Sequence, residues 1–273
     1  MTEFDPAAVA IRPAATVMLV RDGAAGVEVF MLRRTLQAAF AGGMYVFPGG
    51  RVDDLDRSAT MESVCDGLRD DRASALLQIS SGGLAYWVAA IRECFEEAGV
   101  LLARSVQSGE VLRFDDPAIA ARFNTARHEI HDSSLGLVEL CERENLRLVT
   151  DEIFYTAHWI TPMGESRRFD TRFFLARAPQ AQEPLHDDGE TIASLWVHPT
   201  EALARCRAGE LLMLPPTIAC LEFLEPHATA ASALAAAATV GEPPTILPKI
   251  VPSAPGAPLQ VLMPGDLGYD QLP

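Results

Sequence analysis

The stretch IRECFEEAGV, from Ile91 to Val100, decides the fold of this chain. At about 100° per residue on a helix, carboxylates at positions i, i+3 and i+4 lie within roughly a quarter turn of one another. Here they are Glu93, Glu96 and Glu97. Apolar residues at the spacing of a buried stripe lie on the opposite side, and Gly99 stands where a helix commonly ends in a left-handed residue. The stretch therefore predicts a helix with one buried face and an acidic triplet on the other.

The acidic triplet has two interpretations. Like charges at this spacing repel, at a cost of a few tenths of a kcal/mol for each i, i+4 pair. A hard divalent cation with oxygen ligands turns such a liability into a binding site, and phosphate oxygens commonly complete the shell of Mg²⁺. The alternative is a solvated acidic helix face without a ligand.

Two segments carry a resemblance to a known family. Arg92 to Val100, RECFEEAGV, matches the second half of the Nudix box, R-E-U-x-E-E-x-G-U with U apolar, at every position. Upstream, Phe47 to Asp53, FPGGRVD, is similar to the P-G-G-x-V segment that opens this box. The chain therefore resembles a Nudix hydrolase.

The box departs from the usual pattern, G-x5-E-x7-R-E-U-x-E-E-x-G-U, in one respect. Counted from Gly50, its first acid is Asp56 instead of Glu, and Asp56 precedes Arg92 by 36 positions, an excess of 28. An insertion therefore splits the box. A split box followed by the segment RRFDTRFF, Arg167 to Phe174, resembles the branch that contains the peroxisomal-type coenzyme A diphosphatases.

The resemblance implies a fold of the α/β class, the Nudix α/β/α sandwich with a mixed sheet. We expect one domain over residues 1–241, with an insertion at about 55–83 inside the box and a helical insertion at about 116–145. The proline-rich residues 242–273 form the predicted C-terminal arm. We expect Leu259 to Leu262 of this arm to pair with a sheet edge or with a second subunit, which would make a homodimer.

Hydrophobic periodicity predicts the individual elements. Alternating or continuous apolar runs predict strands at 14–21, 27–33, 44–47, 100–103, 153–161, 168–177 and 191–197. A helix is expected at 116–130, with proline at its first position, and a second at 135–144. The two helices are interpreted as a lid or specificity element.

The resemblance also implies a metal site. One or more Mg²⁺ or Mn²⁺ ions would be bound by Glu93, Glu96 and Glu97 with the carbonyl of Gly49. The cation would neutralise diphosphate oxygens and lower the pKa of an attacking water. Arg92, one turn before Glu96, is expected to orient that carboxylate, and we count it with the three acids among the catalytic residues.

The remaining candidates lie outside the box helix. Arg33 and Arg34 lie at the end of a predicted strand, and the resemblance implies that this strand end contacts substrate phosphates or the nucleotide. Solvated strand-end charges are the alternative. Gly50 and Arg51 join them as candidate substrate-binding residues. Glu190 is a candidate catalytic base in the acidic segment 183–190, which a solvated turn explains nearly as well.

Composition excludes several classes of function. The formal charge of −15 argues against non-specific nucleic-acid binding, which depends on Lys and Arg. The only lysine is Lys249, so the Gly-Lys pair of a Walker-type loop is missing. Five scattered cysteines indicate reduced thiols. With neither a signal peptide nor an apolar run of spanning length, a cytoplasmic enzyme without a membrane partner is expected.

The predicted function is hydrolysis of a nucleoside diphosphate linked to another group. Coenzyme A or an acyl-coenzyme A is the first expectation, giving 3′,5′-ADP and (acyl-)4′-phosphopantetheine. An ADP-ribose or dinucleotide diphosphatase is the enzymatic alternative. A Nudix-fold sensor that binds a nucleotide without cleaving it is the alternative of another class, and it usually lacks box carboxylates that are present here.

Overall fold

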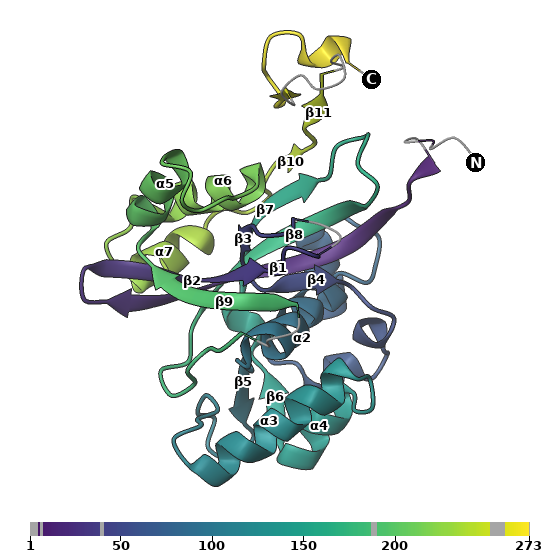
Figure 1. Ribbon diagram of the computed structural model, residues 1–273. Helices are drawn as coiled ribbons and strands as arrows, with labels where there is room; N and C mark the ends of the chain where they lie inside the picture. Colours follow the sequence, from purple (N-terminus) through teal and green to yellow (C-terminus); the bar gives the residue numbers. More distant parts are fainter. Residues whose placement is uncertain (1–4, 6–7, 39–40, 187–189, 252–259, 273) are drawn as a thin grey trace.

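A mixed eight-stranded sheet forms the centre of the molecule (Figure 1). The computed structural model describes residues 5, 8–38, 41–186, 190–251 and 260–272. The strand order is β10 (Thr245–Ile246), β7 (Phe154–Ile160), β8 (Arg168–Arg177), β1 (Ile11–Gly23), β2 (Gly26–Arg34) and β3 (Tyr45–Val46). Outside this order, β4 (Gly49–Arg51) pairs with β1, and β9 (Thr191–Val197) pairs with β2. The pairs β1–β8 and β7–β10 are parallel, and the others are antiparallel.

Strand β1 shows why the sheet is covered on both faces. Successive side chains of a strand point to opposite faces. Val17 and Leu19 belong to one core cluster, whereas Met18 and Val20 belong to the other, and all four are fully buried. The continuous apolar run in the sequence is thus explained by two cores.

Helices cover both faces, and their packing gives the three layers of the predicted sandwich (Figure 1). One layer contains α1 (Asp70–Leu77), α2 (Leu84–Ala98), α3 (Pro117–His131) and α4 (Leu137–Glu144). The other contains α5 (Pro199–Arg207), α6 (Pro215–Leu224) and α7 (Ala230–Ala237). The α/β/α prediction is confirmed. Every helix in the described part of the chain is too short or too polar to cross a bilayer.

The box helix α2 is fixed at both ends. At its start, the Asp70 carboxylate of α1 accepts hydrogen bonds from the backbone N–H groups of Gly82 and Leu84, each 3.0 Å long. At its end, Gly99 adopts the expected left-handed conformation (φ 69°) and donates its N–H to the carbonyl of Phe95. The insertion that splits the box therefore caps the helix that carries the box.

The two insertions pack against each other beside α2. The first contains η2 (Leu55–Arg57), η3 (Met61–Val64) and α1, and the second contains α3 and α4. Segment η3 contacts α4 and β6 (Leu146–Leu148), which pairs with β5 (Ala103–Ser105). A short 3-10 turn, η4 (Thr150–Glu152), follows β6. The strand expected at 100–103 is wrong in extent, since only Ala103 belongs to β5.

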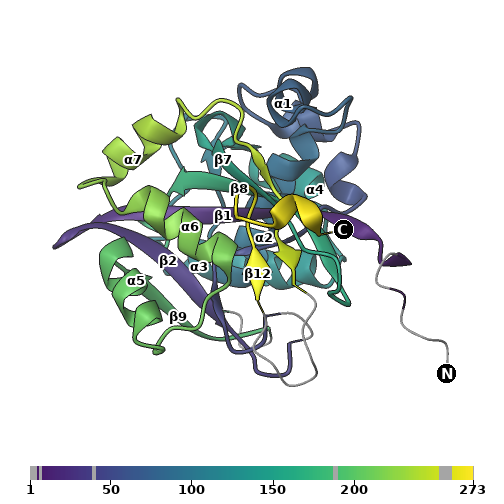
Figure 2. The ribbon, with the colours of Figure 1, turned by 90° about the horizontal axis from the view of Figure 1, so that it is seen from above.

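The C-terminal segment lies on the side of the sheet that carries α5 to α7 (Figure 2). Strand β10 extends the sheet at β7. Strand β12 (Val261–Leu262) pairs with β11 (Lys249–Ile250) of the same segment, before η5 (Tyr269–Gln271). The expected pairing of Val261 and Leu262 with an edge of the main sheet is therefore corrected. Their pairing with a second subunit stays a prediction, and Leu259 lies outside the described residues. The division at residue 241 stays a prediction.

Candidate active site

The two halves of the split box meet in space. Asp56 in η2 is 2% exposed, and both of its carboxylate oxygens accept hydrogen bonds from Arg92, at 2.9 Å from Nε and 3.0 Å from Nη2. The backbone N–H of Asp53 donates to the same carboxylate at 2.8 Å. A bidentate guanidinium–carboxylate pair fixes both distance and angle. The insertion therefore leaves the two halves of the box in direct contact through Asp56 and Arg92.

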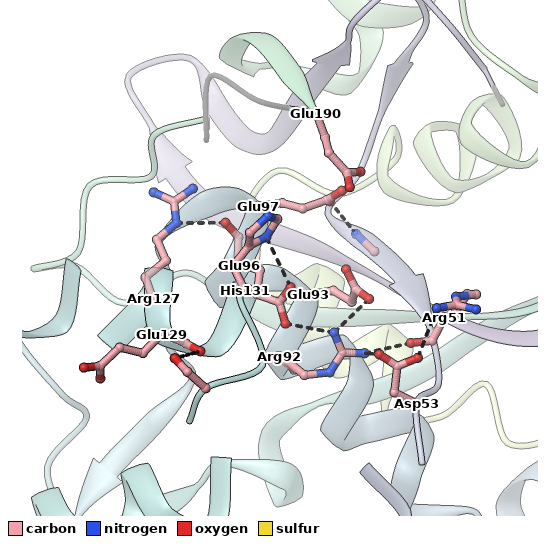
Figure 3. Close-up of polar contacts among 12 residues, drawn as sticks. Arg51, Asp53, Arg92, Glu93, Glu96, Glu97, Arg127, Glu129, His131 and Glu190 are labelled. Carbon is pink, nitrogen blue, oxygen red and sulfur yellow. Dashed lines mark hydrogen bonds and ion pairs between the residues drawn. The ribbon is translucent and has the colours of Figure 1, made fainter. Parts of the chain in front are cut away.

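Arg92 also holds two acids of the box helix (Figure 3). Its Nη1 lies 3.0 Å from Oε1 of Glu93 and 2.9 Å from Oε1 of Glu96, while Nη2 donates to the carbonyl of Arg51 at 2.8 Å. We call the five residues Asp56, Arg92, Glu93, Glu96 and Glu97 the box cluster. Within it Arg92 positions carboxylates from both halves, including Glu96 as the sequence led us to expect.

Glu97 is directed towards the glycine loop. It is 6% exposed, and its Oε2 accepts a hydrogen bond of 2.9 Å from the N–H of Gly49. In the antiparallel β1–β4 ladder Gly49 lies opposite Thr16, next to a pair in which Val17 donates to the carbonyl of Pro48. Val17 and Pro48 form a hydrogen-bonded pair, and such pairs alternate with non-hydrogen-bonded ones, so Thr16 and Gly49 form a non-hydrogen-bonded pair. The carbonyl of Gly49, like its N–H, therefore points away from β1. That carbonyl is thus available to a ligand near Glu97.

Gly50 provides room for the acidic face. A Cβ at this position would collide with the carboxyl group of Glu93. The residue next to Gly50, Arg51, contributes its carbonyl to Arg92, and its own guanidinium lies 3.6 Å from Asp53 at the surface. Gly50 is therefore needed for the close approach of the loop to the helix, whereas the Arg51 side chain lies at the rim.

Arg34 and Glu190 lie beside the box cluster. Nη1 of Arg34 is 3.6 Å from Oε1 of Glu97, and its Nη2 is 3.3 Å from Oε2 of Glu190. The Glu190 carbonyl accepts a hydrogen bond from the N–H of Thr35. Arg33 points to the other face of β2, where it donates to the carbonyl of Gly43. The structure therefore brings Arg34 and Glu190 to the cluster and places Arg33 elsewhere; residues 187–189 of the acidic segment lie outside the described residues.

Burial raises the pKa of three acids of the cluster, Asp56, Glu93 and Glu97. It raises the pKa of Glu93 to about 7, although the charge of Arg92 lowers it. Burial and the charge of Glu93 hold the pKa of Glu97 well above the usual range of a carboxyl group. Burial also raises the pKa of Asp56 by more than the bonds to Arg92 lower it. Negative charge in this cluster is therefore incompletely compensated by the chain itself.

The donor set of the cluster fits a hard divalent cation. Four carboxylates face only two guanidinium groups, those of Arg92 and Arg34. Among the residues that the structure describes, no group of three or more His, Cys, Asp or Glu side chains gathers closely enough to hold a metal. The reason is local: Arg92 binds Glu93 and Glu96, while Glu97 turns to the Gly49 N–H. The three acids thus surround Arg92 and the glycine loop instead of converging on one point.

Two residues of α3 reach the site and were not expected from the sequence. Arg127 is buried, and it donates from Nε to the carbonyl of Glu96 at 2.8 Å and from Nη2 to that of Leu185 at 3.3 Å. Nδ1 of His131 lies 3.7 Å from Oε2 of Glu96. Figure 3 shows both side chains directed at the end of α2. Their i, i+4 spacing on a predicted helix was the available signal, but only tertiary packing shows which element that face meets.

Comparison with known proteins agrees with this geometry. A family model described as the NUDT19 Nudix domain matches residues 68–224, which is more than half of the chain. The chain belongs to the Nudix hydrolase family. The matched range includes α2 with the second half of the box.

Curated relatives and a solved structure are similar to this Nudix chain. The acyl-coenzyme A diphosphatase NUDT19 of Gallus gallus is 28% identical over 228 residues, covering 69% of this chain and 58% of the relative. That of Homo sapiens is 27% identical over 226 residues, covering 71% and 59%. The chain thus spans little more than half the length of these relatives. A crystal structure of a Nudix hydrolase from Alicyclobacillus acidocaldarius is 29% identical, with a TM-score of 0.66, covering 84% of this chain and 97% of that one.

Proposed function

We propose that this protein hydrolyses the diphosphate of coenzyme A or an acyl-coenzyme A in a metal-dependent reaction. The products would be 3′,5′-ADP and 4′-phosphopantetheine or its acyl form. Membership of the Nudix hydrolase family supports the reaction class. The names of the two NUDT19 relatives, acyl-coenzyme A diphosphatase, support the substrate class. A homodimer and a cytoplasmic location stay predictions.

The observation that carries this proposal is the closure of the split box by Asp56 and Arg92. It places the carboxylates of Glu93 and Glu96 on one guanidinium, next to the buried Glu97. These three acids and the Gly49 carbonyl would hold Mg²⁺ or Mn²⁺. When bound, the cation supplies charge neutralisation for diphosphate oxygens and a more acidic water.

The chain's own residues have separate tasks around the diphosphate. Arg34 presents a guanidinium between Glu97 and Glu190, where it can bind phosphate oxygens. Glu190 is the proposed proton acceptor, because its half-exposed carboxylate can reach water on this side of the cluster. Arg92, fully engaged by carboxylates, acts by positioning Glu96 and Asp56.

A product analysis tests the proposal. The protein is incubated with Mg²⁺ and, separately, coenzyme A, acetyl-coenzyme A, ADP-ribose, NADH and diadenosine tetraphosphate, and products are identified by mass. We expect 3′,5′-ADP from the first two substrates, with turnover abolished by EDTA. Glu129→Gln, a half-exposed glutamate of α3 outside the cluster, is the matched control for Glu97→Gln. Binding without turnover would indicate a sensor, and turnover of ADP-ribose alone would replace the proposed substrate.

A further inference from the structure

A cavity of about 300 Å³ lies beside the box cluster, and no step of the proposed reaction uses it. Asp56, Arg92 and Glu96 form one side of it, and His131 lies next to Glu96 on the wall (Figure 3). The remaining lining comes from η2, η3 and the α3–α4 pair. The two insertions thus enclose a space that adjoins the predicted reaction centre.

The walls of the cavity combine apolar side chains with polar and charged ones. The apolar side chains of the lining come from both insertions, from residues 55–61 of the first and residues 130–138 of the second. They are Leu55, Met61, Ile130, Leu135, Leu137 and Val138. Ser58, Thr60 and Ser133 add hydroxyl groups. Small-molecule pockets usually join apolar walls to polar groups that orient the ligand, and this lining offers both.

The charge of the lining restricts what can enter. Its acids are Asp53, Asp56, Glu96, Glu139 and Glu142. The guanidinium of Arg92, which also lines the cavity, is already bonded to Asp56, Glu93 and Glu96. A phosphate group would therefore meet repulsion there, whereas the N–H groups of uncharged amides would find carboxylate acceptors.

From this volume, lining and charge we propose that the cavity binds the uncharged pantetheine arm of the substrate. The inference rests on the proposed function and assigns the orientation of the substrate at that site. A volume at the lower end of the range of ligand pockets, about 300–1,000 Å³, suits part of a ligand. The nucleotide half then lies towards Arg34, the proposed phosphate-binding residue, which does not line the cavity.

Gly136, which lines the cavity at the start of α4, offers a way to fill it. A Cβ at this position meets no atom within 4 Å, and its φ of −93° is open to any residue. Gly136→Phe therefore adds a ring without backbone strain. Asn124→Phe places the same ring on the exposed face of α3, outside the cavity, and is the matched control. Leu55→Trp is a second filling variant at a wall residue that is 61% exposed, so it does not depend on the fold tolerating Gly136→Phe.

Two measurements test the inference. Binding of pantetheine alone, which has no phosphate, is followed by saturation-transfer NMR, and kcat and KM are measured for coenzyme A with Mg²⁺. We expect pantetheine binding by the parent and by Asn124→Phe. In the filling variants we expect its loss and a KM for coenzyme A raised about tenfold or more, with kcat changed less.

The outcomes separate the two proposals. A parent protein that cleaves neither coenzyme A nor acetyl-coenzyme A overturns the proposed function. A parent that cleaves coenzyme A while the folded filling variants keep both the KM and the pantetheine signal overturns only the cavity assignment. Absence of pantetheine binding to the parent overturns the cavity assignment as well.

Discussion

Two clusters of buried charge differ in how completely the chain neutralises them. In the box cluster four carboxylates face Arg92 and Arg34, and burial raises the pKa of Glu93 and Glu97. The second cluster is formed by Tyr155, His158, Asp170 and Arg172. Its one carboxylate, that of Asp170, lies close to both the guanidinium of Arg172 and the ring of His158.

The second cluster, which we call the Arg172 cluster, pairs its charges internally, although Nε of Arg172, 3.4 Å from Oδ1 of Asp170, makes no hydrogen bond within the described part of the chain. Nη1 of Arg172 donates to the hydroxyl of Tyr155 at 2.9 Å and lies 2.7 Å from Nδ1 of His158. Because a guanidinium only donates, Nδ1 accepts, and the ring proton on Nε2 points to Asp170 at 2.6 Å. Burial would raise the pKa of Asp170, but His158 and Arg172 outweigh it and the pKa is lowered.

The difference separates a structural cluster from a candidate catalytic one. The Arg172 cluster takes Asp170 and Arg172 from the segment RRFDTRFF, which in the sequence resembles the split-box branch. It joins β7, β8 and, through Thr245, β10. It needs no further charge. The box cluster has carboxylates in excess, and an added cation would relieve their repulsion.

The largest expected effect is that of Glu97→Gln. The amide oxygen can still accept the N–H of Gly49, while one negative charge is lost. We expect turnover with Mg²⁺ to fall about a thousandfold or more. The melting temperature of the metal-free protein should stay the same or rise, because the raised pKa of Glu97 shows that its charge is unfavourable in the fold. Turnover equal to that of Glu129→Gln would remove Glu97 from the catalytic set.

Arg172→Met should have the reverse pattern. Removing one partner of a buried ion pair leaves Asp170 uncompensated, and we expect a loss of about 3 kcal/mol in the free energy of unfolding. The dependence of turnover on Mg²⁺ concentration should remain that of the parent. Urea unfolding and a Mg²⁺ titration of activity measure the two effects. A changed Mg²⁺ dependence would show that the two clusters are not independent.

The stability of the metal-free protein should depend on pH through the box cluster. Because the pKa of Glu93 is raised to about 7, the folded state retains a proton that the unfolded state has released, so this stabilisation is full below about pH 4.5 and is lost as the pH rises through 7. At about 1.4 kcal/mol per pKa unit, the loss is up to about 3 kcal/mol. Urea unfolding at pH 5 and pH 8 measures it. Mg²⁺ should restore stability at pH 8, and a flat profile without metal would contradict the charge imbalance.

The smallest effect distinguishes two adjacent arginines. Arg34→Ala should raise the KM for coenzyme A about tenfold, because Arg34 lies between Glu97 and Glu190. Arg33→Ala should change it less than about threefold, since Arg33 points to the opposite face of β2. Steady-state kinetics compares them directly. Equal effects would mean that the substrate spans both faces of the strand end.

Local patterns in the sequence predicted strand bounds and helix starts, which depend on residues adjacent in the sequence. Strands β8 and β9 have the expected bounds, and α3 begins at Pro117 behind an Asp116 cap as expected. Counting from Gly50 also identified Asp56 as the first acid of the box. Its hydrogen bond to Arg92 agrees with this, because the insertion leaves the two halves of the motif in contact.

The rest of the site depends on contacts between distant segments. Arg127, His131 and the cavity follow from how α3 and α4 pack on α2, which periodicity does not specify. Glu97, which the sequence placed on an open acidic face, is buried where it contacts Gly49 and Arg34. Arg33 was grouped with Arg34, although alternation along a strand directs adjacent side chains to opposite faces. Its role in substrate binding stays a prediction.

A calorimetric titration of the metal-free protein with Mn²⁺ tests the central claim, that the box cluster binds a divalent cation through its excess carboxylates. Performed at pH 7 in buffers of different ionisation enthalpy, it also counts released protons. The account predicts binding with proton release in the parent and in Glu129→Gln, and binding at least about tenfold weaker in Glu97→Gln. Equal Mn²⁺ affinity in all three proteins, or no binding to the parent, would contradict it.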